Sequence, residues 1–159
     1  MEPLLPCKEL QSSPDLRGVS PQTVADLVTG KLAVRYVLID GRFEYEYKGG
    51  HIRSAVNLSN VEAIEEFLQT QCCPWDSTAI IFHCEYSSQR GPWLCRRLRQ
   101  HDRLMNLENY PVLTYPQVYL MEGGYNAFFK AFAQCCEPEA YVPMRSEDLS
   151  RVRREFKKL

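Results

Sequence analysis

The sequence predicts an α/β fold in which a central parallel sheet of about five strands is covered by helices on both faces. Short apolar runs, typical of buried parallel strands, alternate along the chain with segments whose apolar residues recur at helical spacing. The loops between them are short, as in repeated strand–helix–strand units. The length of 159 residues suits one domain with a sizeable core, and 45% apolar and 25% charged residues are ordinary for a globular protein.

The first helix is expected over about residues 21–29. Ser20 is a suitable N-cap, Pro21 suits the first helical position, and Gly30 suits the end. Before it, residues 1–18 contain several prolines and no clear periodicity, so we expect an extended arm there. After it, each strand is a run of consecutive apolar residues, and each helix shows apolar residues three and four positions apart. These elements are expected as strand 36–39, strand 55–58, helix 61–71, strand 78–82, helix 91–104, strand 118–121, helix 125–133 and a charged helix 146–159.

Composition limits the classes of function. The net charge of −1 gives no sign of a nucleic-acid partner, and no run approaches the ~20 apolar residues of a membrane helix. The beginning of the chain, with Glu2 and no apolar run, does not resemble a signal peptide. The seven cysteines are an odd number without metal-type pairs, so we expect reduced thiols, no metal and no cofactor. We therefore expect an intracellular monomer in the nucleus, the cytoplasm or both.

The most informative segment is His83-Cys84-Glu85-Tyr86-Ser87-Ser88-Gln89-Arg90, followed by Gly91-Pro92. It joins an apolar strand to a helix, and five residues separate its cysteine from its arginine. Backbone N–H groups turned inward at the start of a helix favour a thiolate and bind phosphate oxygens. Arg90 adds a planar fork that can bind two of those oxygens. The alternative, a core cysteine beside a surface arginine, is weaker because the polar loop would be a poor core.

This arrangement predicts phosphoryl transfer to sulfur. Cys84 would attack phosphorus in line, and water would then hydrolyse the phosphocysteine. The loop N–H donors come from the phosphate-binding residues Glu85, Tyr86, Ser87, Ser88, Gln89 and Arg90. The hydroxyls of Ser87 and Ser88 could also donate to the sulfur or to the phosphate. For His83 we favour an indirect role through geometry.

Several segments in order resemble one known family. They are Ser20 to Val24 with Thr29-Gly30-Lys31, Tyr45-Glu46-Tyr47 to Ile52 with Ala55 to Leu58, the run from His83 to Pro92, Glu122 to Tyr125 with Phe128-Phe129, and Cys136-Glu137-Pro138 with Tyr141 and Pro143-Met144. This series is similar to the catalytic domain of the M-phase inducer phosphatases, the dual-specificity enzymes of the cell division cycle. The resemblance implies a rhodanese-like domain over 19–145, preceded by the arm 1–18 and followed by the charged helix 146–159.

The resemblance also implies a substrate and residue roles. The substrate would be phosphothreonine and phosphotyrosine in a cyclin-dependent kinase–cyclin complex, whose activation promotes cell-cycle progression and mitosis. Cys84 would be the nucleophile and Arg90 the phosphate clamp. Arg99, Arg103 and Tyr110 stand where the family docks its kinase, although a solvated basic helix face is the plain alternative. The basic stretch from Arg151 to Lys158 would extend that surface or form an ordinary terminal helix.

Two departures from the family pattern affect the chemistry. Gln89 stands where the family often has glutamate, which leaves Glu85 as the carboxylate of the loop and the candidate general acid. If Glu85 does not protonate the leaving group, the substrate phosphate or water does. Gly41 stands where the family commonly has a cysteine that protects the nucleophile by disulfide formation. Cys72, Cys73, Cys95 or Cys136 could substitute, but we expect Cys95 to be a packing residue and Cys84 to over-oxidise easily.

The remaining polar residues of the matched region favour a supporting role. Asp40, Arg42, Glu46 and His51 resemble the internal polar network of the rhodanese scaffold. The main alternative function is a rhodanese-fold arsenate reductase, since arsenate resembles phosphate. A sulfurtransferase would have a loop one residue shorter, and a conventional tyrosine phosphatase would need a Trp-Pro-Asp loop after the sheet. A non-catalytic binding module would not need an intact Cys84 and Arg90.

Overall fold

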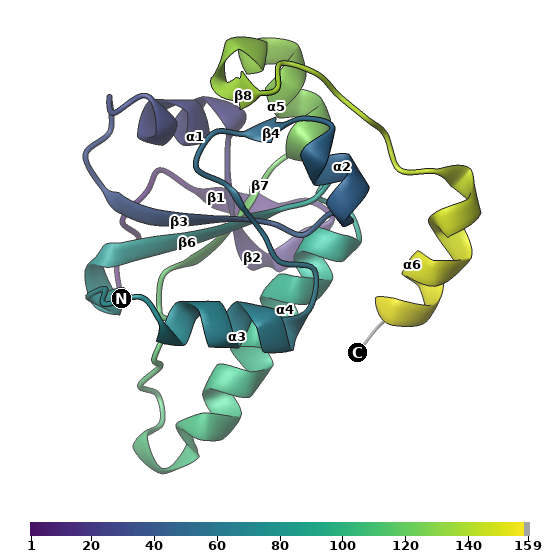
Figure 1. The fold of residues 1–159 in the computed structure, drawn as a ribbon. Coiled ribbons are helices and arrows are strands. Elements are labelled where there is room, and N and C mark those ends of the chain that lie inside the picture. The colour runs from purple at the N-terminus through teal and green to yellow at the C-terminus, as the bar shows by residue number, and fades with distance from the viewer. Residues whose placement is uncertain (158–159) are drawn as a thin grey trace.

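A six-stranded sheet lies at the centre of the computed structural model, which describes residues 1–157 (Figure 1). Neighbouring strands are parallel except for the antiparallel pair at one edge. In spatial order the strands are β1 (Lys8–Leu10), β2 (Ser13–Val19), β7 (Val118–Met121), β6 (Thr78–His83), β3 (Arg35–Asp40) and β5 (Val56–Asn57). Strands β4 (His51–Ile52) and β8 (Cys136–Glu137) form a separate antiparallel pair.

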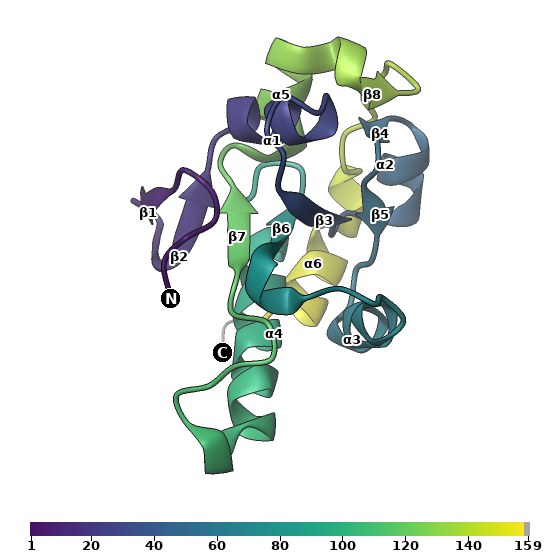
Figure 2. The same ribbon diagram turned by 90° about the vertical axis from the view of Figure 1, so that its left-hand side faces the viewer.

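Helices cover both faces of the sheet (Figure 2). The helices are α1 (Pro21–Val28), α2 (Glu44–Lys48), α3 (Val61–Gln69), α4 (Arg90–Met105), α5 (Gly124–Phe132) and α6 (Leu149–Glu155). All six residues of β6 are buried, because alternate side chains enter cores on opposite faces. Ile81 packs with residues of α1 and α5, whereas Ile80 and Phe82 pack with residues of α3, α4 and α6.

The predicted α/β class, the parallel central sheet and the helices on both faces are confirmed. The expected count of about five strands is slightly low, because the main sheet has six. The difference arises in the segment 1–18, where we expected only an extended arm. Strand β1 and most of β2 come from this segment, and β2 pairs with β7 through Gly18 and Val19. Its sequence Ser-Pro-Asp-Leu-Arg-Gly-Val lacks an apolar run, so pairing with β1 and β7, and not local propensity, makes it a strand.

Side-chain N-caps mark where helices α1 and α3 begin. The Ser20 hydroxyl accepts from the N–H of Thr23 at 3.1 Å, and the Asn60 side chain accepts from the N–H of Ala63 at 2.8 Å. Helix α4 differs, because it follows the loop at Gln89 with no side-chain cap. Its first N–H groups therefore remain available to the loop that precedes it.

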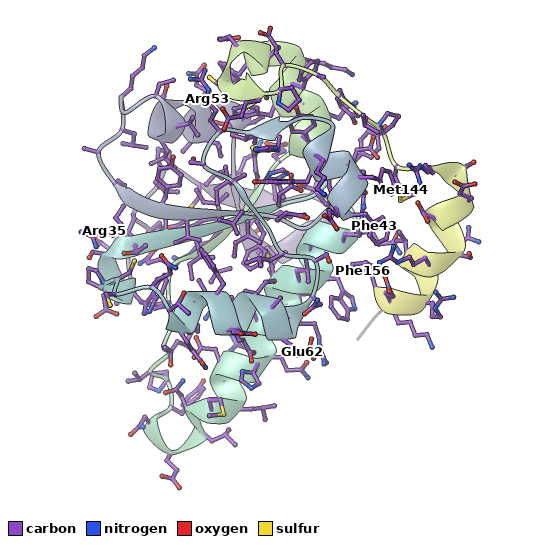
Figure 3. The ribbon with its side chains drawn as sticks, viewed as in Figure 1. Arg35, Phe43, Arg53, Glu62, Met144 and Phe156 are labelled. Carbon is purple, nitrogen blue, oxygen red and sulfur yellow. The ribbon has the colours of Figure 1, made fainter. Side chains whose placement is uncertain are left out.

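The C-terminal helix is shorter than the predicted range 146–159. Helix α6 covers Leu149–Glu155 and follows a 3-10 turn over Ser146–Asp148, within the predicted range 146–159. Positions 158 and 159 of that prediction, including Lys158 of the basic stretch, lie outside the described residues. Val152 and Phe156 are buried, so one face of this charged segment belongs to the core. Phe43, Met144 and Phe156 all lie on the side of the molecule that α6 covers (Figure 3).

Candidate active site

Cys84 directly follows β6, at the carboxyl end of that strand, and begins the loop that leads to α4 at Arg90. Its side chain is buried, and its Sγ accepts a hydrogen bond from the N–H of Gly91 at 3.1 Å. Gly91 is in the first turn of α4, a helix of 16 residues, so the sulfur lies at the positive end of the helix dipole. A Cβ at Gly91 would lie 3.5 Å from the sulfur and 3.0 Å from Leu120 Cδ1, which explains why a small residue follows Arg90.

The back of the loop is held by the start of α5. The carbonyl of Cys84 accepts from the N–H of Tyr125, and that of Glu85 accepts from the N–H of Asn126, both at 2.9 Å. Gly124 permits this approach, since a Cβ there would lie 2.5 Å from the Glu85 carbonyl oxygen and its φ is +62°. Because α5 takes these two carbonyl groups, it fixes the direction in which the loop backbone faces.

Ser87 has the most constrained backbone in the loop, with a φ of 54° in the left-handed region. Its side chain is buried, and its Oγ has no hydrogen-bond partner within residues 1–157. A buried hydroxyl without a partner is costly, so a ligand oxygen is a suitable partner for it. Tyr86, Ser88 and Gln89 are exposed and form the outer part of the loop.

Arg90 is almost fully buried and makes a two-pronged ion pair with Glu46 of α2. Its Nη1 and Nη2 donate to Oε2 and Oε1 at 2.6 and 3.0 Å. Burial alone would lower the pKa of Arg90, but the hydrogen bond to Glu46 and nearby negative charge raise it above its ordinary value. Glu46 Oε2 also accepts from the N–H of Phe43, at 2.9 Å, so this carboxylate both closes the first turn of α2 and orients the arginine.

Asp40 and Arg42 form a second, fully buried pair beneath the site. Arg42 donates to both oxygens of Asp40, at 2.7 to 3.1 Å, and to the carbonyl of Gly50 at 2.8 Å. Its guanidinium also lies 4.1 Å from the centre of the Tyr125 ring. Burial would raise the pKa of Asp40, but the adjacent charge and hydrogen bonds of Arg42 outweigh it and hold that pKa below its ordinary value. These contacts link the end of β3, the residue before β4 and α5, which is the supporting role expected for Asp40 and Arg42.

His83 is buried and bonded to the loop backbone. Its Nδ1 lies 3.1 Å from the carbonyl oxygen of Cys84, and since a carbonyl only accepts, this nitrogen carries the proton. Its Nε2 lies 3.9 Å from Asp40 Oδ2, beyond hydrogen-bonding distance. Burial lowers the pKa of His83 and outweighs the opposing effect of Asp40. His51 lies elsewhere in the scaffold, where it stacks on Tyr47 with ring centres 3.8 Å apart.

Glu85 is buried and bonded to the segment that follows β8. Its Oε2 accepts from the hydroxyl of Tyr141 at 2.6 Å, and its Oε1 accepts from the N–H of Met144 at 3.2 Å. Burial and this hydrogen bond raise the pKa of Tyr141, so its hydroxyl stays protonated as the donor. Both carboxylate oxygens of Glu85 are thus acceptors in a structural contact, which favours a positioning role over proton donation.

The three expected docking residues differ in their exposure and in their contacts within the protein. Arg103 and Tyr110 are exposed and line one small hollow of about 190 Å³ beyond the end of α4. Arg99 is partly buried and donates to the carbonyl of Tyr115 at 2.7 Å and to Asp102 at 3.4 Å. Burial lowers the pKa of Arg99, and Arg103 adds to this effect. The structure therefore brings Arg103 and Tyr110 together and assigns Arg99 a contact within the protein.

Gly41 is the second departure from the family pattern, and its surroundings explain it. A Cβ at Gly41 would lie 2.5 Å from Leu94 Cδ1, so Leu94 fills the space that a side chain would need. Cys95 is fully buried, and its Sγ lies 3.9 Å from the carbonyl oxygen of Tyr119. Burial raises the pKa of Cys95, which makes it a poor thiolate and agrees with the expected packing role.

Sequence reasoning missed three features of the site. Glu46 was expected only as scaffold, yet it is the ion-pair partner of Arg90. The Gly123-Gly124 turn and Tyr141 were noted only as family motifs, although both hold the loop. The Gly-Gly pair after a buried strand is a signal that could have been used, since it often marks a close backbone approach. Within residues 1–157, no group of three acidic, histidine or cysteine side chains could hold a metal ion, and no helix is long and apolar enough to cross a membrane.

Comparison with known proteins supports these observations. M-phase inducer phosphatase 3 of Homo sapiens is 46% identical over 141 residues, which cover 84% of this chain and 29% of that protein. M-phase inducer phosphatase 1 of Homo sapiens is 44% identical over 149 residues, covering 90% of this chain and 28% of that protein. The resemblance inferred from the motifs is thus confirmed. The chain spans less than a third of the length of these curated relatives.

Solved structures show the same fold. The yeast protein Ygr203w, described as a protein tyrosine phosphatase of the rhodanese family, has a TM-score of 0.57 at 20% identity, over 79% of this chain and 92% of that one. The As-Sb reductase of Leishmania major has a TM-score of 0.58 at 21% identity, over 81% of this chain and 87% of that one. At such identities the likeness establishes the fold alone. Residues 20–131 match the rhodanese-like domain, and the chain therefore belongs to the rhodanese-like domain family.

Proposed function

We propose that this chain is a cysteine-dependent dual-specificity protein phosphatase that dephosphorylates cyclin-dependent kinases. The observation that carries the proposal is the arrangement at the start of α4. The buried sulfur of Cys84 accepts from the N–H of Gly91 at the start of the helix, next to the buried Arg90 and to a Ser87 hydroxyl that has no partner within residues 1–157. These are the groups that a tetrahedral oxyanion needs, and the similarity to the M-phase inducer phosphatases supports the same conclusion.

The reaction has two steps. The thiolate of Cys84 attacks phosphorus, an S–P bond forms, and the P–O bond to the threonine or tyrosine oxygen breaks with its electron pair leaving on oxygen. Arg90 and the loop N–H groups stabilise the charge on the phosphoryl oxygens. Water then attacks phosphorus, the S–P bond breaks, and inorganic phosphate and the thiolate are released. The oxidation state of every atom is unchanged, so no cofactor enters this scheme.

The contacts of Glu85 bear on which group protonates the leaving oxygen. Because both of its carboxylate oxygens are engaged by Tyr141 and the Met144 N–H, we assign Glu85 to the support of the loop. The leaving oxygen then receives its proton from the substrate phosphate or from water. Gln89 is exposed in the loop and, as an amide, supplies no acidic proton.

The kinase substrate is supported by the relatives and by the surface at the end of α4. The relatives are named as inducers of M phase, which indicates a role in the cell cycle for those proteins. In this chain Arg103 and Tyr110 are exposed and adjacent, as a docking role requires. We therefore propose a cyclin-dependent kinase–cyclin complex as the protein substrate and activation of the kinase as the result, with the phosphatase acting as a monomer in the nucleus or cytoplasm.

The test is hydrolysis of a doubly phosphorylated kinase–cyclin complex by the wild type and by Cys84→Ser. We expect release of phosphate from both threonine and tyrosine by the wild type and none by the variant. Arsenate with a thiol reductant and thiosulfate with cyanide serve as alternative substrates. Reduction of arsenate or transfer of sulfur at rates exceeding phosphate release would refute the proposal.

A further inference from the structure

A hollow of about 370 Å³ adjoins the phosphate loop, residues 84–90, on the side of the N-terminal hairpin. One wall is formed by residues 86–88 of the loop, and the other by residues 10–12 at the turn between β1 and β2. Glu122 and Gly123, which follow β7, complete the lining. The hairpin lies at the edge of the sheet beside β7 (Figure 2), and this pairing holds its turn near the loop. Ligand pockets of proteins measure about 300–1,000 Å³, so the hollow is of a size for one side chain.

Ser87 connects the hollow with the phosphate loop. Its side chain is 7% exposed, its Oγ has no hydrogen-bond partner within residues 1–157, and its φ of 54° lies in the left-handed region. Glycine at this position would avoid both the strained backbone and the unpaired buried hydroxyl. Two such costs in one residue are expected where a bound ligand compensates for them. Because Ser87 belongs to the loop and also lines the hollow, the hollow is continuous with the phosphate site.

The other side chains of the hollow offer hydrogen bonds and one apolar surface. Gln11, Ser12 and Ser88 present an amide and two hydroxyls. Tyr86 is 55% exposed, so its ring stands free at the outer part of the loop. An aromatic ring with a polar end suits contact with a partner on the surface of a protein. This lining favours a side chain that has both a hydrogen-bonding group and some apolar area.

The charge of the hollow limits what it can hold. Glu122 is the charged residue of the lining, and its carboxylate lies 3.2 Å from the ammonium group of Lys8. Both side chains are exposed, so this ion pair is weak. Among the residues of the described chain that line the hollow, none is arginine or lysine. A carboxylate or a phosphate placed there would meet a like charge without a cation of its own, which is unfavourable.

We propose that the hollow is a specificity subsite that receives the substrate side chain next to the phosphorylated residue. It accepts an uncharged side chain with a hydrogen-bonding group, such as threonine, and it rejects an acidic or phosphorylated one. The inference rests on the proposed phosphatase function and deepens it, because it specifies the neighbour of the phosphorylated residue. When a substrate carries two adjacent phosphates, the second one lies on the other side of the loop.

The first test uses phosphotyrosine peptides in which one neighbour of the tyrosine is threonine, glutamate or phosphothreonine, on either side. With the wild type, we expect kcat/KM to fall about tenfold when the neighbour on one side, and only on that side, becomes acidic or phosphorylated. Equal effects on both sides, or no effect on either side, would overturn the proposal.

Variants assign this discrimination to the hollow. Glu122→Gln removes the like charge and should reduce the effect of phosphothreonine to about threefold or less, whereas Lys8→Gln removes the partner of Glu122 and should increase it. Ser12→Phe fills the hollow and should lower kcat/KM for the threonine peptide about tenfold relative to that for a small aryl phosphate. Ser77→Phe, at an exposed serine before β6, is the matched control and should keep the wild-type ratio. Unchanged discrimination in Glu122→Gln, or equal ratios in the two phenylalanine variants, would refute the subsite.

Binding measurements separate this inference from the proposed activity. In the Cys84→Ser background, Ser12→Phe should weaken binding of the threonine peptide about tenfold. If the wild type hydrolyses neither the peptides nor the aryl phosphate, the phosphatase function fails while this binding measurement still tests the hollow. Hydrolysis of all the peptides at one rate would leave the phosphatase function intact and refute the subsite.

Discussion

The two terminal nitrogens of Arg90 donate to the two carboxylate oxygens of Glu46, at 2.6 and 3.0 Å. Glu46 is fully buried and also accepts from the Phe43 N–H. This contact at the start of α2 holds the carboxylate in the position where it binds Arg90. The pair fixes the plane of the guanidinium at the edge of the phosphate loop. It leaves the other N–H groups of Arg90 to bind a phosphate, since a guanidinium has five donors.

Glu46→Ala is expected to destabilise the protein by about 3–5 kcal/mol, because it leaves the buried charge of Arg90 and the Phe43 N–H without their acceptor. It should also lower kcat, since the arginine is no longer oriented. Thermal unfolding with and without tungstate is the measurement, and the oxyanion should stabilise the variant more than the wild type because it supplies the missing negative charge. Glu44→Gln on the same helix, where Glu44 makes an exposed pair with Lys48, is the control and should change little. Equal stability of Glu46→Ala and the wild type would contradict this role.

Glu85→Gln is expected to reduce kcat/KM for an alkyl phosphate by less than about tenfold, and by the same factor at every pH. The amide can still accept a hydrogen bond, so the contact with the 141–144 segment is largely kept. Tyr141→Phe should produce a similar small loss. A general acid would instead contribute about 10²- to 10⁴-fold and shape one limb of the pH–rate profile. Disappearance of that limb in Glu85→Gln would return the acid role to Glu85.

Charge reversal should distinguish a docking role of Arg103 from a structural role of Arg99. Arg103→Glu is expected to slow hydrolysis of the kinase complex about tenfold with no effect on a small aryl phosphate, because the side chain is exposed and free to meet a carboxylate. Arg99→Glu should lower the melting temperature as well, since it places a carboxylate beside Asp102 and removes the donor to the Tyr115 carbonyl. Equal slowing of both substrates by Arg103→Glu would argue against docking.

Peroxide is expected to inactivate the enzyme irreversibly. Gly41 offers no thiol, and burial raises the pKa of both Cys95 and Cys136, so neither readily forms the thiolate that would trap an oxidised Cys84 as a disulfide. The measurement is the activity that a dithiol reductant restores after peroxide treatment, with mass spectrometry of the Cys84 peptide. Full recovery would show that another cysteine protects the site. Gly41→Ala should be destabilising by itself, because its Cβ would collide with Leu94.

Stability should fall as the pH drops below about 6.5. His83 has a lowered pKa in the folded protein, so as the pH falls through the ordinary histidine value the unfolded chain takes up a proton that the folded protein does not, and the free energy of unfolding decreases. The contribution of neutral His83 to the free energy of unfolding is complete above the ordinary histidine pKa. It is lost as the pH falls from that value to the lower pKa of His83 in the folded protein. The melting temperature of the wild type should therefore decline more steeply between pH 7.5 and pH 5 than that of His83→Gln. Parallel curves would show that His83 does not govern this loss.

Much of the fold could be predicted from local sequence patterns. The buried strands β3, β6 and β7 are continuous apolar runs, and the N-caps and glycines near α1 mark its limits within about two residues. The position of Cys84 between a strand and a helix follows from the same reasoning, because one apolar run ends at Phe82 and one helical pattern begins after Arg90. Strands β1 and β2 were missed because neither contains an apolar run, and the strand that joins them to the sheet, β7, pairs with β2 from about 100 residues further along the chain.

The sequence by itself determined the chemistry that this chain can offer: a cysteine and an arginine five residues apart on a strand–loop–helix junction, and the family to which that junction belongs. Only the tertiary structure decided what surrounds them. Glu46 meets Arg90 across 44 positions, and Tyr141 meets Glu85 across 56. Such contacts depend on how helices pack around the sheet, and no local pattern encodes them.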